Sequence, residues 1–236
     1  MLEVKRLHLA ELTVNGKRWP VHGFVVTHQG GALLVDTGVG GWDELLTDWR
    51  VANRTVADAL GDIDMSPADI DLVINTHLHF DHCGQNAVFP HAACYVQRTE
   101  YERAQVESRE LFDWFGFMNG RFELLDGDAE IVPGVRVITT PGHTSGHQSV
   151  LVSGSDGSVD VLIGDAAYTT VQFGGLEASG RPGVAEASGR PGVPADEELP
   201  PGQAADPVAW RESLQRIKAA EPARVHFCHD TALVHR

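Results

Sequence analysis

Three histidines and one aspartate fall within six consecutive positions of the segment "NTHLHFDHCG", residues 75–84. His77, His79 and Asp81 occupy every second position, so an extended backbone would point all three side chains to one side. His82 follows directly and could reach a second centre where the chain turns. Neutral imidazole and carboxylate are ligands that zinc prefers. The segment therefore predicts a metal site, and its density of ligands predicts two ions rather than one.

Further metal-capable residues lie where apolar runs end in short polar segments: His143 in "TPGHTSGH", Asp165 in "LIGDAAY" and His229 in "HFCHD". In α/β proteins, functional sites gather at the carboxyl ends of strands. A lone histidine at one of these positions would more often be structural, but the repeated coincidence favours a metal site. His147 and His226 lie near these candidates and could either orient a ligand or serve only the structure.

The elements that would position these residues alternate between strand and helix patterns, which predicts an α/β fold. Runs rich in Val, Leu and Thr predict strands at residues 2–14, 22–28, 32–38, 71–75 and 94–97. Later strands are expected in "VRVITTPG", "QSVLVSG", "SVDVLIGD" and "RVHFCHD". Helices are expected over 98–118, at Ser66-Pro67-Ala68-Asp69 and after Asp206-Pro207, where an N-cap residue precedes proline.

A single domain is expected over residues 1–236, with a Gly/Pro-rich insertion at about 171–205. The insertion is poor in large apolar side chains and carries a tandem copy of "EASGRPGV" within 177–193. Two short copies are too few for a solenoid. The duplicated segment is interpreted either as a flexible connection or as a lid over the site.

The composition of the chain limits the classes of partner that it is expected to bind. The formal net charge is −15, from 33 acidic and 18 basic residues, which disfavours nucleic acid and anionic membranes as partners. The chain shows no secretory h-region and no apolar run of about twenty residues, so a cytoplasmic protein with a small-molecule substrate is expected. Three cysteines suggest reduced thiols rather than a disulfide framework. The oligomeric state stays open, a homodimer included.

The pattern H-x-H-x-D-H at 77–82, with the three later ligands, resembles the metallo-β-lactamase superfamily, and so does "LLVDTG" at 33–38. The resemblance covers almost the whole chain. It implies an αββα four-layer sandwich with a dinuclear site in the loops at one edge, and two Zn²⁺ are the expected cofactors.

The resemblance also implies a role for each candidate ligand. His77, His79 and His143 would hold the first metal. The second metal would be held by Asp81, His82 and His229. Asp165 would bridge the two ions, and Asp36 would orient one of the ligand histidines.

Within the superfamily, the residue types at single ligand positions and the net charge distinguish proteins of different activity. β-Lactam hydrolases typically have Cys or Ser in place of the bridging carboxylate, so Asp165 disfavours antibiotic hydrolysis. Flavin-partnered di-iron relatives usually have Glu where this chain has His79. The nucleases of the superfamily favour basic surfaces, and the net charge of −15 disfavours them.

The local sequence resembles N-acyl homoserine lactonases in "HLHFDH", "TPGHTSGHQS" and "GDAAYT". The expected function is therefore the metal-dependent opening of an N-acyl homoserine lactone ring, a quorum-quenching activity. One alternative is a glyoxalase II-like thioesterase, which shares "GHT-x-GH" but adds a helical C-terminal region, whereas only a short tail follows His229. The other is a non-hydrolytic, iron-dependent redox relative, which would use one iron and fewer ligands.

Three residues have expected roles toward the substrate. Asp81 would relay a proton to the departing alkoxide, and Tyr168 would donate a hydrogen bond to the carbonyl oxygen as charge develops on it. Phe80 would contact the substrate. Tyr168 and Phe80 could instead be packing residues. Cys228 stands where lactonases commonly have Gly; it is interpreted as a small packing residue, and the departure leaves the acyl-chain preference open.

Overall fold

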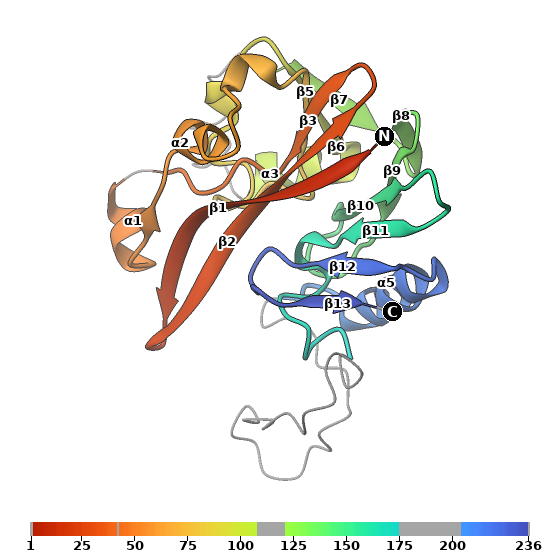
Figure 1. Ribbon diagram of the computed structural model, residues 1–236. Helices are drawn as coiled ribbons and strands as arrows, with labels where there is room; N and C mark the ends of the chain where they lie inside the picture. Colours follow the sequence, from red (N-terminus) through yellow and green to blue (C-terminus); the bar gives the residue numbers. More distant parts are fainter. Residues whose placement is uncertain (1, 42, 108–120, 175–203, 236) are drawn as a thin grey trace.

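Two mixed β-sheets lie face to face in the computed structural model, which describes residues 2–41, 43–107, 121–174 and 204–235. The strand order is β4-β1-β2-β3-β5-β6-β7 in the first sheet and β13-β12-β11-β10-β9-β8 in the second. Helix α2 covers the outer face of the first sheet and α5 that of the second (Figure 1). The expected αββα sandwich is confirmed.

The first sheet is formed by β1 (Glu3–Val14), β2 (Lys17–His28), β3 (Gly31–Val35), β4 (Ala52–Asn53), β5 (Leu72–Ile74), β6 (Ala93–Gln97) and β7 (Arg121–Leu125). The second is formed by β8 (Ala129–Val132), β9 (Val135–Thr139), β10 (Gln148–Ser153), β11 (Val159–Leu162), β12 (Arg224–His226) and β13 (Leu233–His235). The helices of the described residues are α1 (Asp43–Asp48), α2 (Val56–Gly61), α3 (Arg98–Glu107) and α5 (Pro207–Ala219).

The central core lies between the sheets, and strand alternation explains how it forms. Leu33 and Val35 of β3 point into it, while Leu34 between them packs under α2 on the other face. In β11, Leu162 points between the sheets and Val161 packs toward α5. Successive side chains of a strand point to opposite faces, so strands covered on both sides read as continuous apolar runs.

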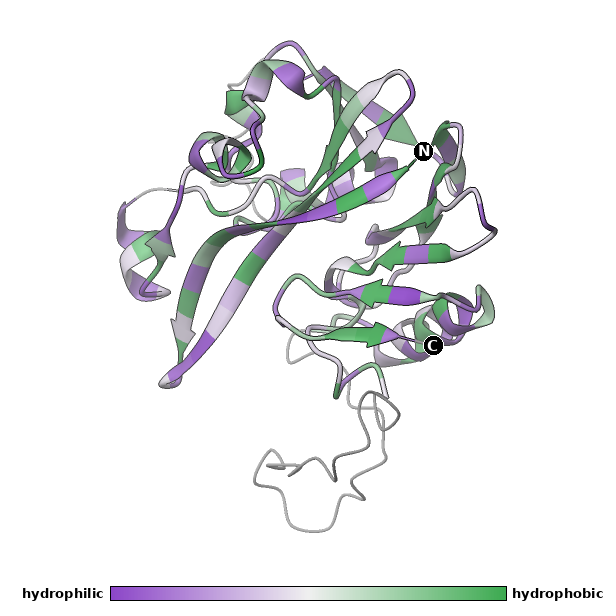
Figure 2. Cartoon of the chain, viewed as in Figure 1, coloured by the Kyte–Doolittle hydropathy of each residue, from purple (hydrophilic) through white to green (hydrophobic). Residues whose placement is uncertain are grey.

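The long hairpin of β1 and β2 differs from these buried strands. Residues 15 and 16 form its turn, and both have positive φ (51° for Asn15 and 76° for Gly16), as a two-residue Asn-Gly turn requires. Hydrophobic and hydrophilic residues largely alternate along β1 (Figure 2), whereas β2 is buried throughout residues 21–26 and more exposed only near its ends. Because the turn ends at Gly16, β2 begins at Lys17, five residues before the expected start at residue 22.

Strand direction brings several strand ends to one edge of the sandwich. β3 pairs in parallel with β5, so both end at the same edge. β10 is antiparallel to both β9 and β11, and β11 is parallel to β12. Consequently β9, β11 and β12 also share a direction, and the segments after all five strands can meet.

Several expectations on local structure were wrong. Ser66–Asp69 forms only a short 3₁₀ turn over Pro67–Asp69 before β5 begins, although Ser66 is the N-cap and proline follows it, as expected. Residues 77–82 form a loop with a turn, in which the amides of His82 and Cys83 donate to the His79 carbonyl. The expected helix 98–118 is confirmed as far as residue 107. Residues 108–118 and the duplicated segment 177–193 lie outside the described residues.

None of the helices in the described ranges has the length and apolarity that a membrane-spanning helix requires.

The start of α5 provides a test of the fold. The Asp206 carboxylate accepts hydrogen bonds from the amides of Val208 and Ala209 at 2.9 and 3.0 Å. We expect Asp206→Ala to lower the free energy of unfolding by about 1 kcal/mol, because two helix amides lose their acceptor. Urea denaturation measures the change, and Asp206→Asn, which retains a cap, should lose less. Equal unfolding midpoints for wild type and Asp206→Ala would contradict the assignment.

Candidate metal centre

The first group of metal-capable side chains consists of His77, His79 and His143, which follow β5 and β9. His77 Nε2 lies 2.9 Å from His79 Nδ1 and 3.2 Å from His143 Nε2, and the last two nitrogens are 3.0 Å apart. Two ligands of one tetrahedral zinc ion are roughly 3.3 Å apart, given metal–nitrogen distances of about 2.0–2.1 Å. The three nitrogens thus converge on one point at distances slightly shorter than those between the ligands of one zinc ion.

The imidazoles of this group are in the state that binds metal. Burial lowers the pKa of His77 and His143 well below the ordinary value and also lowers the pKa of His79. The neighbouring histidines lower the pKa of His77 further, because adjacent imidazolium charges repel each other. Neutral imidazole, with a free lone pair, is the form that coordinates a cation.

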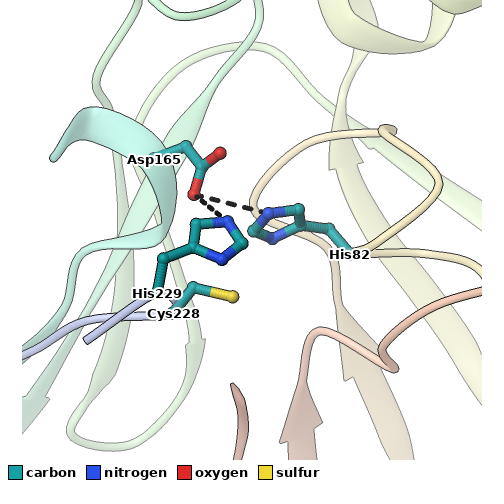
Figure 3. Close-up of side chains that lie close together, drawn as sticks. All are labelled: His82, Asp165, Cys228 and His229. Atoms are coloured by element: carbon teal, nitrogen blue, oxygen red, sulfur yellow. Dashed lines mark ion pairs between the residues drawn. The ribbon is translucent and has the colours of Figure 1, made fainter. Parts of the chain in front are cut away.

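The second group consists of His82, Asp165, Cys228 and His229, whose possible ligand atoms all lie within 4.8 Å of one another. Figure 3 shows these side chains, which come from three separate segments, pointing toward one another. Asp81 joins them, because its Oδ2 lies 3.8 Å from His82 Nε2 and 3.6 Å from His229 Nε2. His82 Nε2 and Asp165 Oδ1 are buried without a hydrogen-bond partner. Such unpartnered buried atoms are what a metal ion would satisfy.

Asp165 lies between the two groups and presents one oxygen to each. Oδ2 is 3.8 Å from His77 Nε2 and 3.4 Å from His143 Nε2. Oδ1 is 3.4 Å from both His82 Nε2 and His229 Nε2. A carboxylate in this position could bridge two metal ions, which is the role expected for this residue.

Electrostatics in the second group favour positive charge. Burial acts to lower the pKa of His82 and His229, but nearby carboxylates, Asp165 foremost, raise both above the ordinary value. Burial acts to raise the pKa of Asp165, yet His82 and His229 hold it well below its usual range. The group therefore binds protons in the absence of a metal, and a divalent cation would replace them.

Two of the candidate ligand histidines, His82 and His229, are oriented by hydrogen bonds from their second ring nitrogen. His82 Nδ1 lies 2.8 Å from Asp36 Oδ2, and Asp36 also accepts from the amide and hydroxyl of Thr76. His229 Nδ1 lies 2.9 Å from the Pro20 carbonyl oxygen. With Nδ1 donating in each case, Nε2 keeps its lone pair toward the metal centre. Asp36 thus fixes the ring of His82, and its role toward a bound metal stays a prediction.

Other residues hold the loops that carry the ligands. Glu100 is fully buried in α3, accepts the Leu78 amide at 2.9 Å and pairs with Arg103 at 2.6 Å. Leu78 lies between two ligand histidines, so Glu100 fixes the backbone that carries them. His147 Nε2 accepts the Asp165 amide at 3.0 Å, which supports the interpretation of His147 as an orienting residue. Glu100 was missed because its partner is 22 residues away in sequence.

The residues expected to face the substrate lie beside the two groups. The Tyr168 hydroxyl is 3.5 Å from His143 Nδ1, and its ring stands edge-on to His229 with centroids 5.3 Å apart. Tyr168 also contacts Trp19 at 6.2 Å between centroids. Phe80 is buried in an apolar cluster, 5.3 Å from Trp49, which favours the packing interpretation of this residue.

Asp36 allows the site to be tested apart from any substrate. We expect Asp36→Ala to weaken metal binding by about 10–100-fold, because His82 loses the acceptor that fixes its tautomer and orientation. Competition with a chromophoric chelator measures the affinity. Asp69→Ala is the control, because Asp69 is exposed and precedes β5, at the end remote from the site. Unchanged affinity in Asp36→Ala would show that His82 needs no such orientation.

Comparison with known proteins finds curated relatives at moderate identity. The chain is 34% identical over 167 residues to an N-acyl homoserine lactonase of a Bacillus species, covering 65% of this chain and 66% of that protein. It is 34% identical over 180 residues to the N-acyl homoserine lactonase AttM of Rhizobium radiobacter, covering 64% of this chain and 66% of AttM. The alignments thus span just under two thirds of these relatives.

Solved structures cover more of the chain. A quorum-quenching N-acyl homoserine lactone lactonase superposes with a TM-score of 0.75 at 26% identity, covering 97% of this chain and 92% of the other. An N-acyl homoserine lactone hydrolase with N-hexanoyl-L-homoserine bound at its catalytic metal centre gives 0.73 at 25% identity, covering 98% and 93%. The family described as the metallo-β-lactamase superfamily matches residues 16–229. The chain belongs to the metallo-β-lactamase superfamily.

Proposed function

We propose that this protein is a dinuclear metal-dependent hydrolase that opens the ring of N-acyl homoserine lactones, with zinc as the metal. The observation that carries the proposal is the position of Asp165, which faces one histidine group with each carboxylate oxygen. One zinc ion needs only three or four protein ligands, whereas these groups and Asp81 offer more. Two ions sharing Asp165 use the whole set.

Two bound zinc ions would lower the pKa of a water from about 15.7 toward 7 and polarise a carbonyl group. The protein side chains would position the two metal ions and transfer protons. Asp165 fixes the separation of the two groups. Asp81 lies within 4 Å of His82 and His229, beside the position proposed for the second metal, and would pass a proton to the departing alkoxide.

Tyr168 supplies a hydrogen-bond donor at the same place. Burial, aided by the nearby Asp165 and Asp81 charges, raises the pKa of Tyr168 well above its ordinary value. The phenol therefore stays protonated at neutral pH. A protonated hydroxyl can donate to a carbonyl oxygen as negative charge grows on it, which lowers the barrier to ring opening.

The surroundings of the site favour an acylated lactone over other esters. Trp19 and Tyr168 contact each other beside His229, and Trp19 packs on the apolar cluster that contains Phe80. This apolar wall suits a neutral acyl chain. The lactonase names of the relatives, and the N-hexanoyl-L-homoserine bound by a structural neighbour, support the same substrate class.

A substrate comparison tests the proposal. Zinc-loaded protein should open N-acyl homoserine lactones with a higher kcat/KM than it shows toward a glutathione thioester, a β-lactam or a phosphoester. Elemental analysis of the same preparation should give two zinc ions per chain. Asp165→Ala is the matched inactive control, because it removes the shared carboxylate while both histidine groups remain. Faster turnover of the glutathione thioester would favour the glyoxalase II-like alternative, and a single bound metal after reconstitution would contradict a dinuclear site.

The role of Tyr168 can be tested separately. We expect Tyr168→Phe to lower kcat about tenfold or more, because one donor to the developing oxyanion is lost while a metal shares the load. KM and zinc content should change little, since the bond strengthens only in the transition state. Tyr95→Phe, in the core between the sheets, is the control. Wild-type kinetics in Tyr168→Phe with both ions bound would return this residue to a packing role.

A further inference from the structure

Cys228 lies where the second group of metal-capable residues converges. Its sulfur is within 4.8 Å of the possible ligand atoms of His82, Asp165 and His229. The residue directly precedes His229, two residues after the end of β12, and it is 1% exposed. Figure 3 shows the thiol on the same side of the His229 backbone as the two imidazoles.

The other two cysteines of the chain provide a contrast. Cys94 belongs to the apolar cluster under α2, and Cys83 packs in a cluster around Leu78 and Val96. All three thiols are free and buried. Within the described residues, Cys228 alone among them belongs to a group of metal-capable side chains. Cys228 also packs in an apolar cluster, the one that contains Val39 and Phe80. Apolar burial is therefore common to the three thiols, and the metal-capable neighbours distinguish Cys228.

The immediate contacts of Cys228 leave its sulfur available to a metal. The thiol donates to the His22 carbonyl oxygen at 3.2 Å, and the His22 amide donates to the Cys228 carbonyl oxygen at 3.0 Å. The backbone is thus fixed to β2 independently of the thiol. His82 Nε2 and Asp165 Oδ1, which belong to the same group, are buried without partners. A cation bound to these two atoms would have the sulfur within reach.

We propose that Cys228 Sγ is a ligand of the second metal ion, together with His82, His229 and Asp165. The inference rests on the two-metal part of the proposed function and adds a donor that the ligand pattern of the superfamily did not imply for this chain. On metal binding, the S–H bond breaks, its proton passes to the buffer, and the sulfur electron pair forms the metal–sulfur bond. The hydrogen bond to the His22 carbonyl is given up in exchange.

A sulfur donor would change which metals the second site prefers. Thiolate is a soft ligand that favours zinc and other soft or borderline ions over manganese and magnesium, which favour carboxylate and water. The first group, with three imidazoles, lacks this donor. The two sites of one chain would then differ in selectivity, and zinc would fill the second site in preference to harder ions.

X-ray absorption of the protein with two bound zinc ions tests the proposal directly. We expect a sulfur scatterer at about 2.3 Å from zinc in the wild type. Cys228→Ser should lose this scatterer, because serine keeps the size and the donor to His22 but has no sulfur. Cys94→Ala is the matched control and should retain it. Charge-transfer absorption from sulfur to metal in the cobalt-substituted protein should follow the same pattern.

The outcomes separate this inference from the proposed function. Two zinc ions per wild-type chain without a sulfur scatterer would overturn the role of Cys228 and leave the dinuclear hydrolase standing. A sulfur scatterer that persists in Cys228→Ser would assign the ligand to another thiol and equally overturn it. Fewer than two zinc ions per wild-type chain would instead contradict the proposed function itself.

Discussion

A buried carboxylate between two groups of imidazoles is the interaction on which the rest of the site depends. Asp165 is 3% exposed, and a charged group in that position is costly unless cations or hydrogen bonds surround it. The imidazoles of His82 and His229, whose pKa values are raised, supply that charge when protonated, and a bound metal ion would supply it otherwise. This requirement sets the orientation of the surrounding rings, each of which turns its Nε2 atom toward the Asp165 carboxylate.

The sandwich meets the requirement through strand direction. Five strands end at one edge, and the segments that follow them carry His77, His143, Asp165, His229 and Asp36. Loops alone would hold such a cluster loosely, because its like groups repel one another in the metal-free chain. Buried hydrogen bonds to backbone groups fix them instead, as Glu100 does at Leu78 and His147 does at Asp165. Rigid placement of ligands before the metal arrives favours tight binding.

Local sequence patterns predicted the strands that are buried on both faces, because such strands are continuous apolar runs. β3, β5 and β11 are covered on both faces, so their apolar runs were readable as strands. Helices α1 and α2 escaped prediction, since six-residue helices show too little periodicity. The segment at 77–82 predicted a metal site, and most of its metal-capable residues do lie in the two groups. The turn after His79 sends its side chains to both groups rather than to one side.

The placement of Cys228 shows why ligand sets are harder to predict than ligand motifs. A cysteine beside a ligand histidine has no spacing signal, because adjacent residues of an extended chain ordinarily point to opposite sides. Cys228 and His229 nevertheless lie in one group, since the chain leaves β12 two residues earlier and is free to turn. The hydrogen bonds between Cys228 and His22 fix that turn against β2, a strand about 200 residues away in sequence. Only a contact of this range decides whether such a thiol packs in the core or faces a metal.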